Sequence, residues 1–416
     1  MAEDARVDVL VVGAGLAGLA CARDLVAAGR TVRVLEAGDG VGGRMRTDLR
    51  DGFRLDRGFQ VLNTSYPQVE RRLALRPLRL RPFTPGVLVD TPKGQRRFAD
   101  PSRAPRMAGD LLPGRLASVR DLAALTVLSA RALLLPPRTL VRGTDRTTRT
   151  ALAAAGFSEE IVETFLRPFL SGVFLEDELE TSSRFFHLVW RSMLRGTQVL
   201  PADGIGAVPA QLAGDLPPRA VVLEAPVREL SDTGVVTADG REHAARAVVV
   251  ATGPGAASRL LPDLRVPPTR SVTTYYHAAG SAPLAEPTLL VDSARRVLNT
   301  VVLSEVAPTY APRGENLVAT SVLGTDDSPG AEARVRAVLA ELYGADTSRW
   351  SLVAARPILE ALPAMPPPWP FTRPTRRGPG RYVCGDYRAT GSQQGAMASG
   401  ARAAREILED WAGLAG

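Results

Sequence analysis

The sequence predicts a doubly wound, Rossmann-like α/β domain into which a second, α+β domain is inserted. Three observations lead to this prediction. A buried strand, a glycine-rich turn and an amphipathic helix follow one another at the N-terminus, short β-branched strands recur through the middle, and a strand followed by a helix closes the chain. At 416 residues the chain exceeds the usual size of one core, so two domains are expected.

The N-terminal residues have the pattern of a β-α-β unit. Val7–Val12 is a continuous apolar run, which is typical of a buried parallel strand. Leu16–Ala28 carries apolar residues at helical spacing and is followed by Gly29, a common helix stop. Thr31–Leu35 is predicted as the second strand. The length of the whole unit suits a parallel crossover.

The order of the remaining elements predicts how the two domains divide the chain. Helices are predicted over Ala104–Pro136, Thr147–Leu170, Ser182–Leu194, Ala331–Tyr343 and Ser399–Trp411. Strands are predicted over Val221–Arg228, Arg246–Ala251, Ser271–His277, Arg296–Leu303, Asn316–Leu323 and Arg381–Cys384, with a hairpin turn at Asp239-Gly240 and a proline-rich loop over Met365–Pro379. We therefore assign residues 1–64, 200–265 and 380–416 to the doubly wound domain, and residues 65–199 and 266–379 to the inserted domain.

The composition indicates a globular protein without a disulfide framework or a metal site. Hydrophobic residues make up 45% of the chain and charged residues 23%. Two cysteines, Cys21 and Cys384, and three histidines are too few for a disulfide scaffold or a Cys/His metal site. No signal-peptide pattern begins the chain, and no apolar run reaches the ~18 residues of a membrane span, so we expect a cytoplasmic protein.

The net charge of +7 is concentrated between residues 66 and 107. The basic residues of this stretch outnumber its acids Glu70, Asp90 and Asp100; they are Arg71, Arg72, Arg76, Arg79, Arg81, Lys93, Arg96, Arg97, Arg103 and Arg106. The stretch contains few aromatic residues and no recognition motif, so no nucleic-acid partner is expected. A peripheral membrane contact, an anionic substrate and an ordinary solvated arginine face remain as alternatives.

A glycine motif joins the first strand to the first helix. Gly13, Gly15 and Gly18 form GxGxxG, in which the glycines allow a tight turn, close approach of a pyrophosphate and close helix packing. The pyrophosphate then lies at a helix N-terminus. Glu36 ends the second strand, where a carboxylate can accept hydrogen bonds from both hydroxyls of an adenosine ribose. These residues predict a dinucleotide site without distinguishing NAD from FAD.

A second glycine pair, Gly42-Gly43, follows and precedes Arg44. The stretch Val7–Thr47 resembles the N-terminal signature of the flavin-containing amine oxidase and phytoene desaturase superfamily, which reads GxGxxG, an acid and then GGRxxT. The resemblance implies FAD as the cofactor. It places Gly42, Gly43 and Arg44 along the pyrophosphate and ribityl chain.

The C-terminal residues resemble the closing motif of the same superfamily. Gly385 and Asp386 follow a predicted strand, and by resemblance they meet the ribityl chain or the pyrophosphate. The segment Gln394-Gly395-Ala396 would face the pyrimidine side of the flavin, where a helix N-terminus stabilises the anion of the reduced ring. Weaker resemblances in the superfamily pattern place Gly58 and Gln60 near the isoalloxazine and Val227 at the adenine.

The resemblance implies an FAD-dependent oxidoreductase. The Leu-rich helices favour an apolar or amphipathic small-molecule substrate, which is dehydrogenated (desaturated) by hydride transfer to the flavin. Two alternatives stay open. The first is an enzyme like the amine or protoporphyrinogen oxidases, which returns electrons to oxygen, and the second is a flavin-binding protein without turnover. The sequence does not indicate an oligomeric state.

One departure from the superfamily concerns the catalytic side chains. Many of its amine oxidases use a lysine that positions a water at the flavin, whereas Lys93, the sole lysine here, lies in the basic stretch. Tyr275, Tyr276 and His277 form a polar-aromatic cluster on a predicted strand and are the candidates for acid–base work, together with Gln60.

Overall fold

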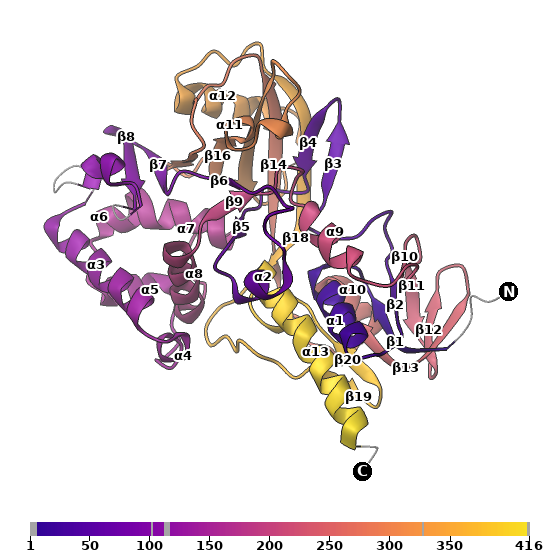
Figure 1. Cartoon of the computed structure of the whole chain (residues 1–416). Helices are drawn as coiled ribbons and strands as arrows, with labels where there is room; N and C mark the ends of the chain where they lie inside the picture. Colours follow the sequence, from indigo (N-terminus) through magenta and orange to yellow (C-terminus); the bar gives the residue numbers. More distant parts are fainter. Residues whose placement is uncertain (1–5, 101–102, 112–116, 327, 414–416) are drawn as a thin grey trace.

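The computed structural model describes residues 6–100, 103–111, 117–326 and 328–413. At the N-terminus, the strand, helix and strand that the sequence predicts are all present. Strand β1 (Val7–Val12), helix α1 (Leu16–Ala27) and strand β2 (Val32–Leu35) follow one another, and β1 pairs with β2 in parallel. The chain is mixed α/β with two large sheets and a separate group of helices (Figure 1). The predicted fold class is confirmed.

The first sheet gathers strands from both ends and from the middle of the chain. Its order is β10-β2-β1-β13-β12-β11, with β20 beside β13 and β19 beside β20. These strands are β10 (Val221–Val222), β11 (Val227–Leu230), β12 (Gly234–Thr237), β13 (Glu242–Val250), β19 (Arg376–Gly378) and β20 (Arg381–Val383). The central strands run parallel, and α1 packs with α13 (Gln393–Gly413) against them. Residues far apart in sequence therefore share one core.

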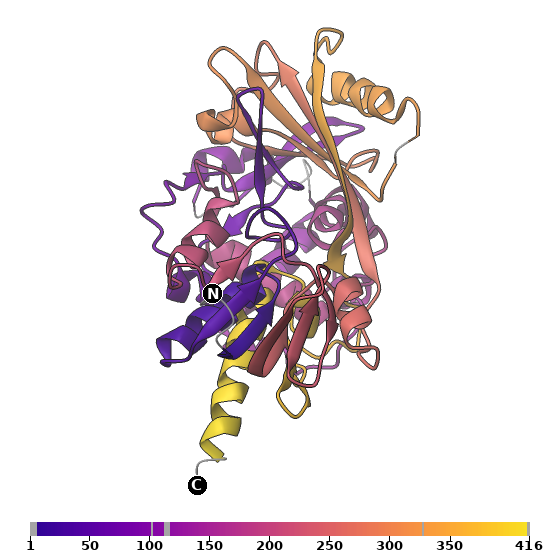
Figure 2. The same ribbon diagram turned by 90° about the vertical axis from the view of Figure 1, so that its right-hand side faces the viewer.

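The second sheet has seven strands and is mostly antiparallel. Its order is β18-β14-β17-β16-β15-β7-β8. The strands are β7 (Gly86–Thr91), β8 (Gly94–Ala99), β14 (Thr269–Ala279), β15 (Leu289–Asp292), β16 (Asn299–Val302), β17 (Asn316–Leu323) and β18 (Ser351–Pro363). Helix α12 (Ala331–Tyr343) packs on one face through Val335 and Leu339. This sheet lies at the opposite end of the molecule from the C-terminus (Figure 2).

A group of helices lies beside the β7 and β8 end of the second sheet (Figure 1). It comprises η1 (Pro105–Leu111), α3 (Val119–Leu134), α4 (Pro137–Leu140), α5 (Thr148–Ala154), α6 (Glu159–Ile161), the π-helix η2 (Val162–Leu166), α7 (Arg167–Phe174) and α8 (Ser183–Arg195). Helix α3 begins at a capping box in which Ser118 and Asp121 bond each other's backbone N–H groups. Phe165, Phe174 and Phe186 belong to the shared core of this group.

Short elements connect these three parts. Strands β3 (Thr47–Arg50) and β4 (Phe53–Asp56) form a hairpin, and β5 (Leu62–Asn63), β9 (Gln198–Leu200) and β6 (Arg81–Pro82) form a small sheet. The remaining helices are α2 (Pro67–Arg72), α9 (Ala207–Gly214), α10 (Pro254–Leu260), α11 (Leu303–Val306), η3 (Pro308–Tyr310) and η4 (Asp386–Arg388). Among the described residues, none of the helices is long and apolar enough to cross a bilayer.

The structure corrects several predicted elements. The predicted strand Val221–Arg228 is interrupted between β10 and β11, where Glu224 adopts φ 53° and Pro226 lacks an N–H. Part of the predicted helical segment Ala104–Pro136 lies outside the described residues, and the rest forms η1 and α3. Strand β18 was not predicted because its sequence contains Pro357 and several charged residues, which are uncommon in central strands. β18 lies at the edge of the sheet, where proline and charged side chains are tolerated.

The basic stretch is only partly a solvated surface. Arg72 is 5% exposed and pairs with Asp24 at 2.6 Å, so it cannot reach a membrane. Arg97 pairs with Glu286 at 2.5 Å, and Arg103 donates to the backbone oxygen of Gly196. These cations hold neighbouring segments together inside the fold, while others, including Arg71 and Arg76, are exposed.

Candidate active site

A cavity of about 1560 Å³ lies where the two sheets and the helical group meet. Its wall includes the β1–α1 turn, the end of β2, residues 42–45 and 57–61, and the start of α13. It also includes one face of the second sheet and parts of α3, α7 and α8. The cavity is therefore bounded by all three parts of the molecule.

The glycines of the β1–α1 turn have distinct positions. Gly13 has φ +104°, and a Cβ there would lie 3.1 Å from the Ala251 oxygen. A Cβ on Gly18 would lie 2.0 Å from the Gly13 oxygen, so this glycine permits close packing of α1 and does not line the cavity. Gly15 lines the cavity and has nothing within 4 Å of its Cβ position, which leaves room for a ligand at the α1 N-terminus.

Glu36 lies at the carboxyl end of β2 and is held by two backbone groups. Its Oε2 accepts a hydrogen bond from the Ala14 N–H at 2.7 Å, and its Oε1 accepts one from the Gly38 N–H at 3.0 Å. The carboxylate lies in the cavity wall, to which Val227 also contributes. Each oxygen keeps a further lone pair for a ligand hydroxyl.

The second glycine pair brings the two ends of the chain together. Gly42 and Gly43 have φ +114° and +58° and lie in the wall beside Gly15. The Arg44 guanidinium contacts Asp386 Oδ2 at 2.8 Å and donates from Nη1 to the Ala361 oxygen at 2.7 Å. The structure thus places the predicted N-terminal and C-terminal segments in one wall.

Of the C-terminal residues predicted to bind the cofactor, some line the cavity and others do not. Gly385, Asp386 and Ala396 line the cavity. Gln394 does not, because its Oε1 accepts the Gln68 N–H at 2.8 Å. Gly395 also lies outside the wall, since a Cβ there would meet the Thr390 oxygen at 1.9 Å. Gln393, which the sequence reasoning passed over, lines the cavity instead and donates from Nε2 to the Val61 oxygen at 3.1 Å.

The segment after β4 also lies in the wall. Gly58 has φ +86°, and Gln60 donates from Nε2 to the Arg44 oxygen at 2.9 Å. Directly before them, the buried Asp56 side chain accepts hydrogen bonds from Thr47, Ile205 and Tyr310. Burial raises the pKa of Asp56 to about 6, although these hydrogen bonds favour its charged form.

The structure does not place Tyr275, Tyr276 or His277 in the cavity wall. The Tyr276 hydroxyl donates to the Asp56 backbone oxygen at 2.7 Å, and the Tyr275 hydroxyl donates to that of Asp326 at 3.2 Å. His277 Nε2 lies 3.0 Å from Glu332 Oε1, and burial lowers the histidine pKa. Both tyrosine hydroxyls and His277 Nε2 are partnered within the protein, and none of the three side chains lines this cavity.

A further part of the wall consists of apolar residues that the sequence reasoning did not single out for a site. Helices α3, η2, α7 and α8 contribute Leu122, Leu125, Phe165, Phe169, Val173, Phe185, Val189, Trp190, Met193 and Leu194. The Trp190 Nε1–H donates to Ser129 Oγ at 3.2 Å. Apolar residues at helical spacing predict a buried helix face. The spacing does not distinguish a face that packs in the core from a face that lines a cavity.

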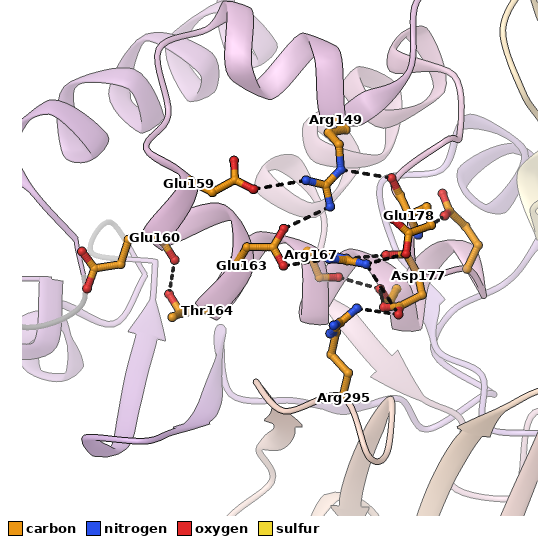
Figure 3. Close-up of polar contacts among 11 residues, drawn as sticks. Arg149, Glu159, Glu160, Glu163, Thr164, Arg167, Asp177, Glu178 and Arg295 are labelled. Carbon is orange, nitrogen blue, oxygen red and sulfur yellow. Dashed lines mark hydrogen bonds and ion pairs between the residues drawn. The ribbon is translucent and has the colours of Figure 1, made fainter.

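An ion-pair network anchors α7, one of the cavity-wall helices (Figure 3). The Arg167 guanidinium contacts Glu163 at 2.8 Å and Glu178 at 2.6 Å. Arg149 of α5 also contacts Glu163, at 3.0 Å. Arg295, from the segment between β15 and β16, contacts Asp177 at 2.5 Å. Carboxylates and guanidiniums of this network therefore tie the helical group to the second sheet.

The wall fits FAD. The N–H groups of the α1 N-terminus receive no capping side chain, and the open space at Gly15 suits a pyrophosphate. Glu36 suits a ribose diol, and Gly43, Arg44, Asp386 and the apolar helical residues line the same cavity. A dinucleotide can therefore extend along the N-terminal and C-terminal segments, with space remaining for a substrate.

Known proteins resemble this chain over short stretches of sequence. A stretch of 56 residues is 64% identical to putrescine oxidase of Kocuria rosea, and a stretch of 54 residues is 56% identical to phytoene dehydrogenase of Streptomyces griseus. These stretches cover 14% and 13% of this chain and only 12% and 11% of the two enzymes.

Solved structures resemble the chain over almost its whole length. Cyclohexylamine oxidase from Brevibacterium oxydans IH-35A has a TM-score of 0.72 at 19% identity, covering 98% of this chain and 100% of that one. A putative protoporphyrinogen oxidase from Exiguobacterium sp. 255-15 has a TM-score of 0.70 at 18% identity, covering 97% and 99%. At these identities the likeness shows a common fold.

The family model for flavin-containing amine oxidoreductases matches residues 16–408 of this chain. The match includes Gly18, the last glycine of the N-terminal motif, together with Glu36, the inserted segments and the C-terminal motif. It confirms the resemblance drawn from the two ends of the sequence, and with it FAD as the cofactor and oxidoreduction as the class of reaction. The chain therefore belongs to the flavin-containing amine oxidoreductase family.

Proposed function

We propose that this enzyme dehydrogenates an apolar or amphipathic small molecule. The main support for the proposal is the composition of one part of the cavity wall. The wall that helices α3, α7, α8 and the π-helix contribute to the cavity contains apolar and small neutral polar residues, and among these described residues none is charged. Polar atoms in this part of the wall come from Thr126, Ser129 and the Trp190 indole.

The lack of charged side chains in this part of the wall bears on the charge of the substrate. An alkylamine is a cation at neutral pH, since its pKa resembles that of lysine, about 10.4. Moving a cation into an apolar pocket without a paired carboxylate costs several kcal/mol. An apolar molecule gains about 25 cal/mol for each Å² that it buries in the same pocket. The helical part of the wall therefore favours a hydrocarbon-like substrate over a charged amine, and the Asp100 carboxylate elsewhere in the lining already pairs with Arg103 at 3.5 Å.

The chain contributes binding and orientation to this reaction. FAD, when bound, supplies the hydride acceptor. The apolar side chains of α7 and α8 line the cavity, where they would bind the apolar part of a substrate and exclude water. Arg44, fixed by Asp386, and Gln60, fixed by the Arg44 oxygen, keep the opposite wall in place. We assign no side chain as a catalytic acid or base, because orientation suffices when the cofactor carries the redox chemistry.

Anaerobic mixing of the yellow enzyme with two sets of compounds tests the proposal. A set of neutral isoprenoids and cyclic alkenes, which includes members that carry a hydroxyl or carbonyl group, is expected to contain compounds that bleach the flavin absorption, whereas 1,4-diaminobutane and cyclohexylamine at pH 7 are not expected to do so. Bleaching by the amines alone would instead favour amine oxidation, and oxygen uptake on admitting air would mark an oxidase. A flavin that neither set reduces would favour a binding protein without turnover.

A matched pair of variants tests the apolar wall itself. Val173→Asp places a carboxylate in the wall, and we expect it to lower the rate of flavin reduction by an apolar substrate at least about tenfold, since an unpaired buried charge costs more than 1.4 kcal/mol. Val127→Asp makes the same change on an exposed part of α3, 58% accessible, and should leave the rate unchanged. Equal rates in both variants would contradict the proposal.

A further inference from the structure

Two uncharged polar side chains interrupt the apolar surface that the second sheet presents to the cavity. Asn299 on β16 and Ser321 on β17 are directly opposite each other in the antiparallel ladder, so their side chains lie on the same face. Both line the cavity, and they are only 6% and 4% exposed. The neighbouring wall residues Val291 and Leu298 are apolar.

Neither side chain has a hydrogen-bond partner among the described residues. The Asn299 Oδ1 atom is buried and unpaired, and no bond to Asn299 Nδ2 or Ser321 Oγ is formed by the described part of the chain. The adjacent pair on the opposite face behaves differently. The Thr300 and Thr320 hydroxyls lie 2.9 Å apart, and Thr300 also contacts the Tyr343 hydroxyl at 3.0 Å. Buried polar groups are normally paired, so the unpaired ones on the cavity face need a partner from the cavity.

The same row of the sheet continues through two residues that are partnered. Thr274 lies opposite Ser321 on β14, and its hydroxyl accepts the Phe59 N–H at 3.3 Å. Arg356 lies beyond it on β18 and pairs with Asp48 at 3.0 Å. The charge in this row is therefore neutralised and two strands away from Ser321. Only the Asn299 and Ser321 positions of the row combine burial, a cavity face and unused polar atoms.

We propose that Asn299 and Ser321 anchor an uncharged oxygen group, a hydroxyl or a carbonyl, on an otherwise apolar substrate. This inference rests on the proposed function and narrows its substrate class. An asparagine amide donates from one end and accepts at the other, and rotation about its terminal torsion exchanges the two. A serine hydroxyl does both. Gly172 of α7 provides the necessary room, since a Cβ there would lie 2.8 Å from Asn299 Nδ2.

The anchor determines specificity as well as position. A pocket built to hydrogen-bond an oxygen group rejects an analogue that lacks it, because the polar atoms of the pocket are then left unpaired. A purely hydrocarbon molecule would fill the wall of α7 and α8 but leave Asn299 and Ser321 unbonded. The expected substrate is therefore an apolar body that carries one neutral oxygen function.

Matched pairs of probes test the anchor with the FAD-loaded enzyme. The pairs are 4-phenylcyclohexanol with phenylcyclohexane, and 1-decanol with decane. Binding is measured by the shift of the flavin absorption bands and by quenching of tryptophan fluorescence, because Trp190 lines the cavity. The wild-type enzyme should bind each alcohol at least about tenfold more tightly than its hydrocarbon, the factor that one hydrogen bond supplies.

Variants assign this preference to the two residues. Asn299→Leu and Ser321→Ala should each weaken alcohol binding about tenfold and leave hydrocarbon binding unchanged or tighter. Thr300→Val is the matched control, because it removes a hydroxyl from the same strand on the face away from the cavity and should alter neither affinity. Flavin content and melting temperature report whether each variant folds. If Asn299→Leu does not fold, Ser321→Ala, which is the smaller change, tests the anchor alone.

The outcomes separate the anchor from the proposed function. If wild-type enzyme binds alcohol and hydrocarbon equally, or if both variants keep the preference for the alcohol, the anchor is wrong and the apolar chamber stands. If neither member of either pair binds, the apolar chamber and the anchor are both overturned. A preference that disappears in Asn299→Leu or Ser321→Ala and persists in Thr300→Val supports the anchor.

Discussion

Glu36 is held in its position by the backbone of its own domain. The Ala14 N–H and the Gly38 N–H bond one carboxylate oxygen each, so the side chain loses little further freedom when a ligand binds. The Glu36 carboxylate therefore stabilises the surrounding turns and is also positioned to bind a ribose.

Glu36→Ala should weaken FAD binding by about 1–3 kcal/mol, the scale for losing hydrogen bonds to a charged acceptor. Turnover per bound flavin should change little, because the adenosine end lies far from the reacting ring. Titration of the apoprotein with FAD, followed by fluorescence, measures the first quantity. Glu242→Ala, an exposed acid in the same sheet, is the control. A collapse of turnover in the flavin-bound fraction would contradict the ribose assignment.

Asp56 makes stability depend on pH. Burial raises its pKa to about 6, whereas an unfolded aspartate has a pKa near about 3.9. Between these values the native state holds a proton that the unfolded chain has released. The contribution of Asp56 to the unfolding free energy is therefore greatest below about pH 4 and declines as the pH rises through about 6.

Asp56→Asn removes this titration and keeps a side-chain oxygen that can accept from Ile205 and Thr47. Relative to the variant, the wild-type protein should lose stability as the pH rises from 4 to 7, by up to about 3 kcal/mol for a shift of two pKa units. Melting temperatures of both proteins across this range test the expectation. A difference that is constant with pH would show that Asp56 does not titrate there.

The sequence predicted best the residues whose roles depend on their immediate neighbours. Gly13, Gly15 and Glu36 act within one β-α-β unit, so their spacing determines their geometry. Tyr276 and His277 could not be placed in the same way. Whether a strand residue faces a cavity or a packed layer depends on distant partners, here Asp56 and Glu332.

At the scale of elements, the contact between α1 and α13 joins the two ends of the chain. A Cβ on Gly400 would lie 2.0 Å from the Ala17 oxygen and 3.1 Å from the Cys21 nitrogen. The two helices therefore approach each other through backbone atoms. This close approach keeps the start of α13, with Gln393 and Ala396, against the cavity.

Gly400→Ala should destabilise the protein by about 1–3 kcal/mol, because the methyl group forces the two helices apart. Flavin affinity should fall as well, since α13 contributes to the cavity wall. Chemical denaturation and FAD titration measure the two effects. Gly214→Ala in α9 is the control, because nothing lies within 4 Å of that Cβ position and no loss is expected. Equal stabilities of the two variants would show that the helices adjust without cost.

Elements that follow a regular apolar period were predicted, and those that break the period were missed. Helix α12 matches its predicted range because its apolar residues recur at helical spacing. Few residues of strand β18 are buried, and Pro357 and Glu360 lie within it, so its sequence lacks the regular apolar alternation that predicts a strand. The pairing of β18 with β14, rather than its own composition, makes it a strand.

At the scale of the whole molecule, the cofactor could be inferred from the sequence and the shape of the substrate site could not. The FAD motifs lie in two short segments that the first sheet brings together. The apolar wall is built from four helical segments and the second sheet, and the sequence did not show which of their side chains face a common cavity. The division into residues 1–64, 200–265 and 380–416 against 65–199 and 266–379 stays a prediction.

Helix α3 separates the cavity from the outside of the molecule. Leu122 and Leu125 line the cavity, while Val127 and Leu134 are 58% and 81% exposed. Arg131, on the same helix, is exposed as well. An exposed apolar helix face with cations is the arrangement that peripheral membrane helices use. An apolar substrate would then enter the cavity from lipid.

We therefore predict salt-sensitive binding of this protein to anionic liposomes. Each cation near such a surface contributes about 1 kcal/mol, so Arg131→Gln with Arg138→Gln should reduce flotation clearly at low salt. Leu134→Gln should reduce it further, whereas Leu359→Gln, an equally drastic change at a leucine 71% exposed on β18, should not. Arg72 is excluded from the test because its loss would break the buried pair with Asp24. Flotation that is independent of anionic lipid at low salt would contradict the prediction and favour the alternative in which these arginines are simply solvated.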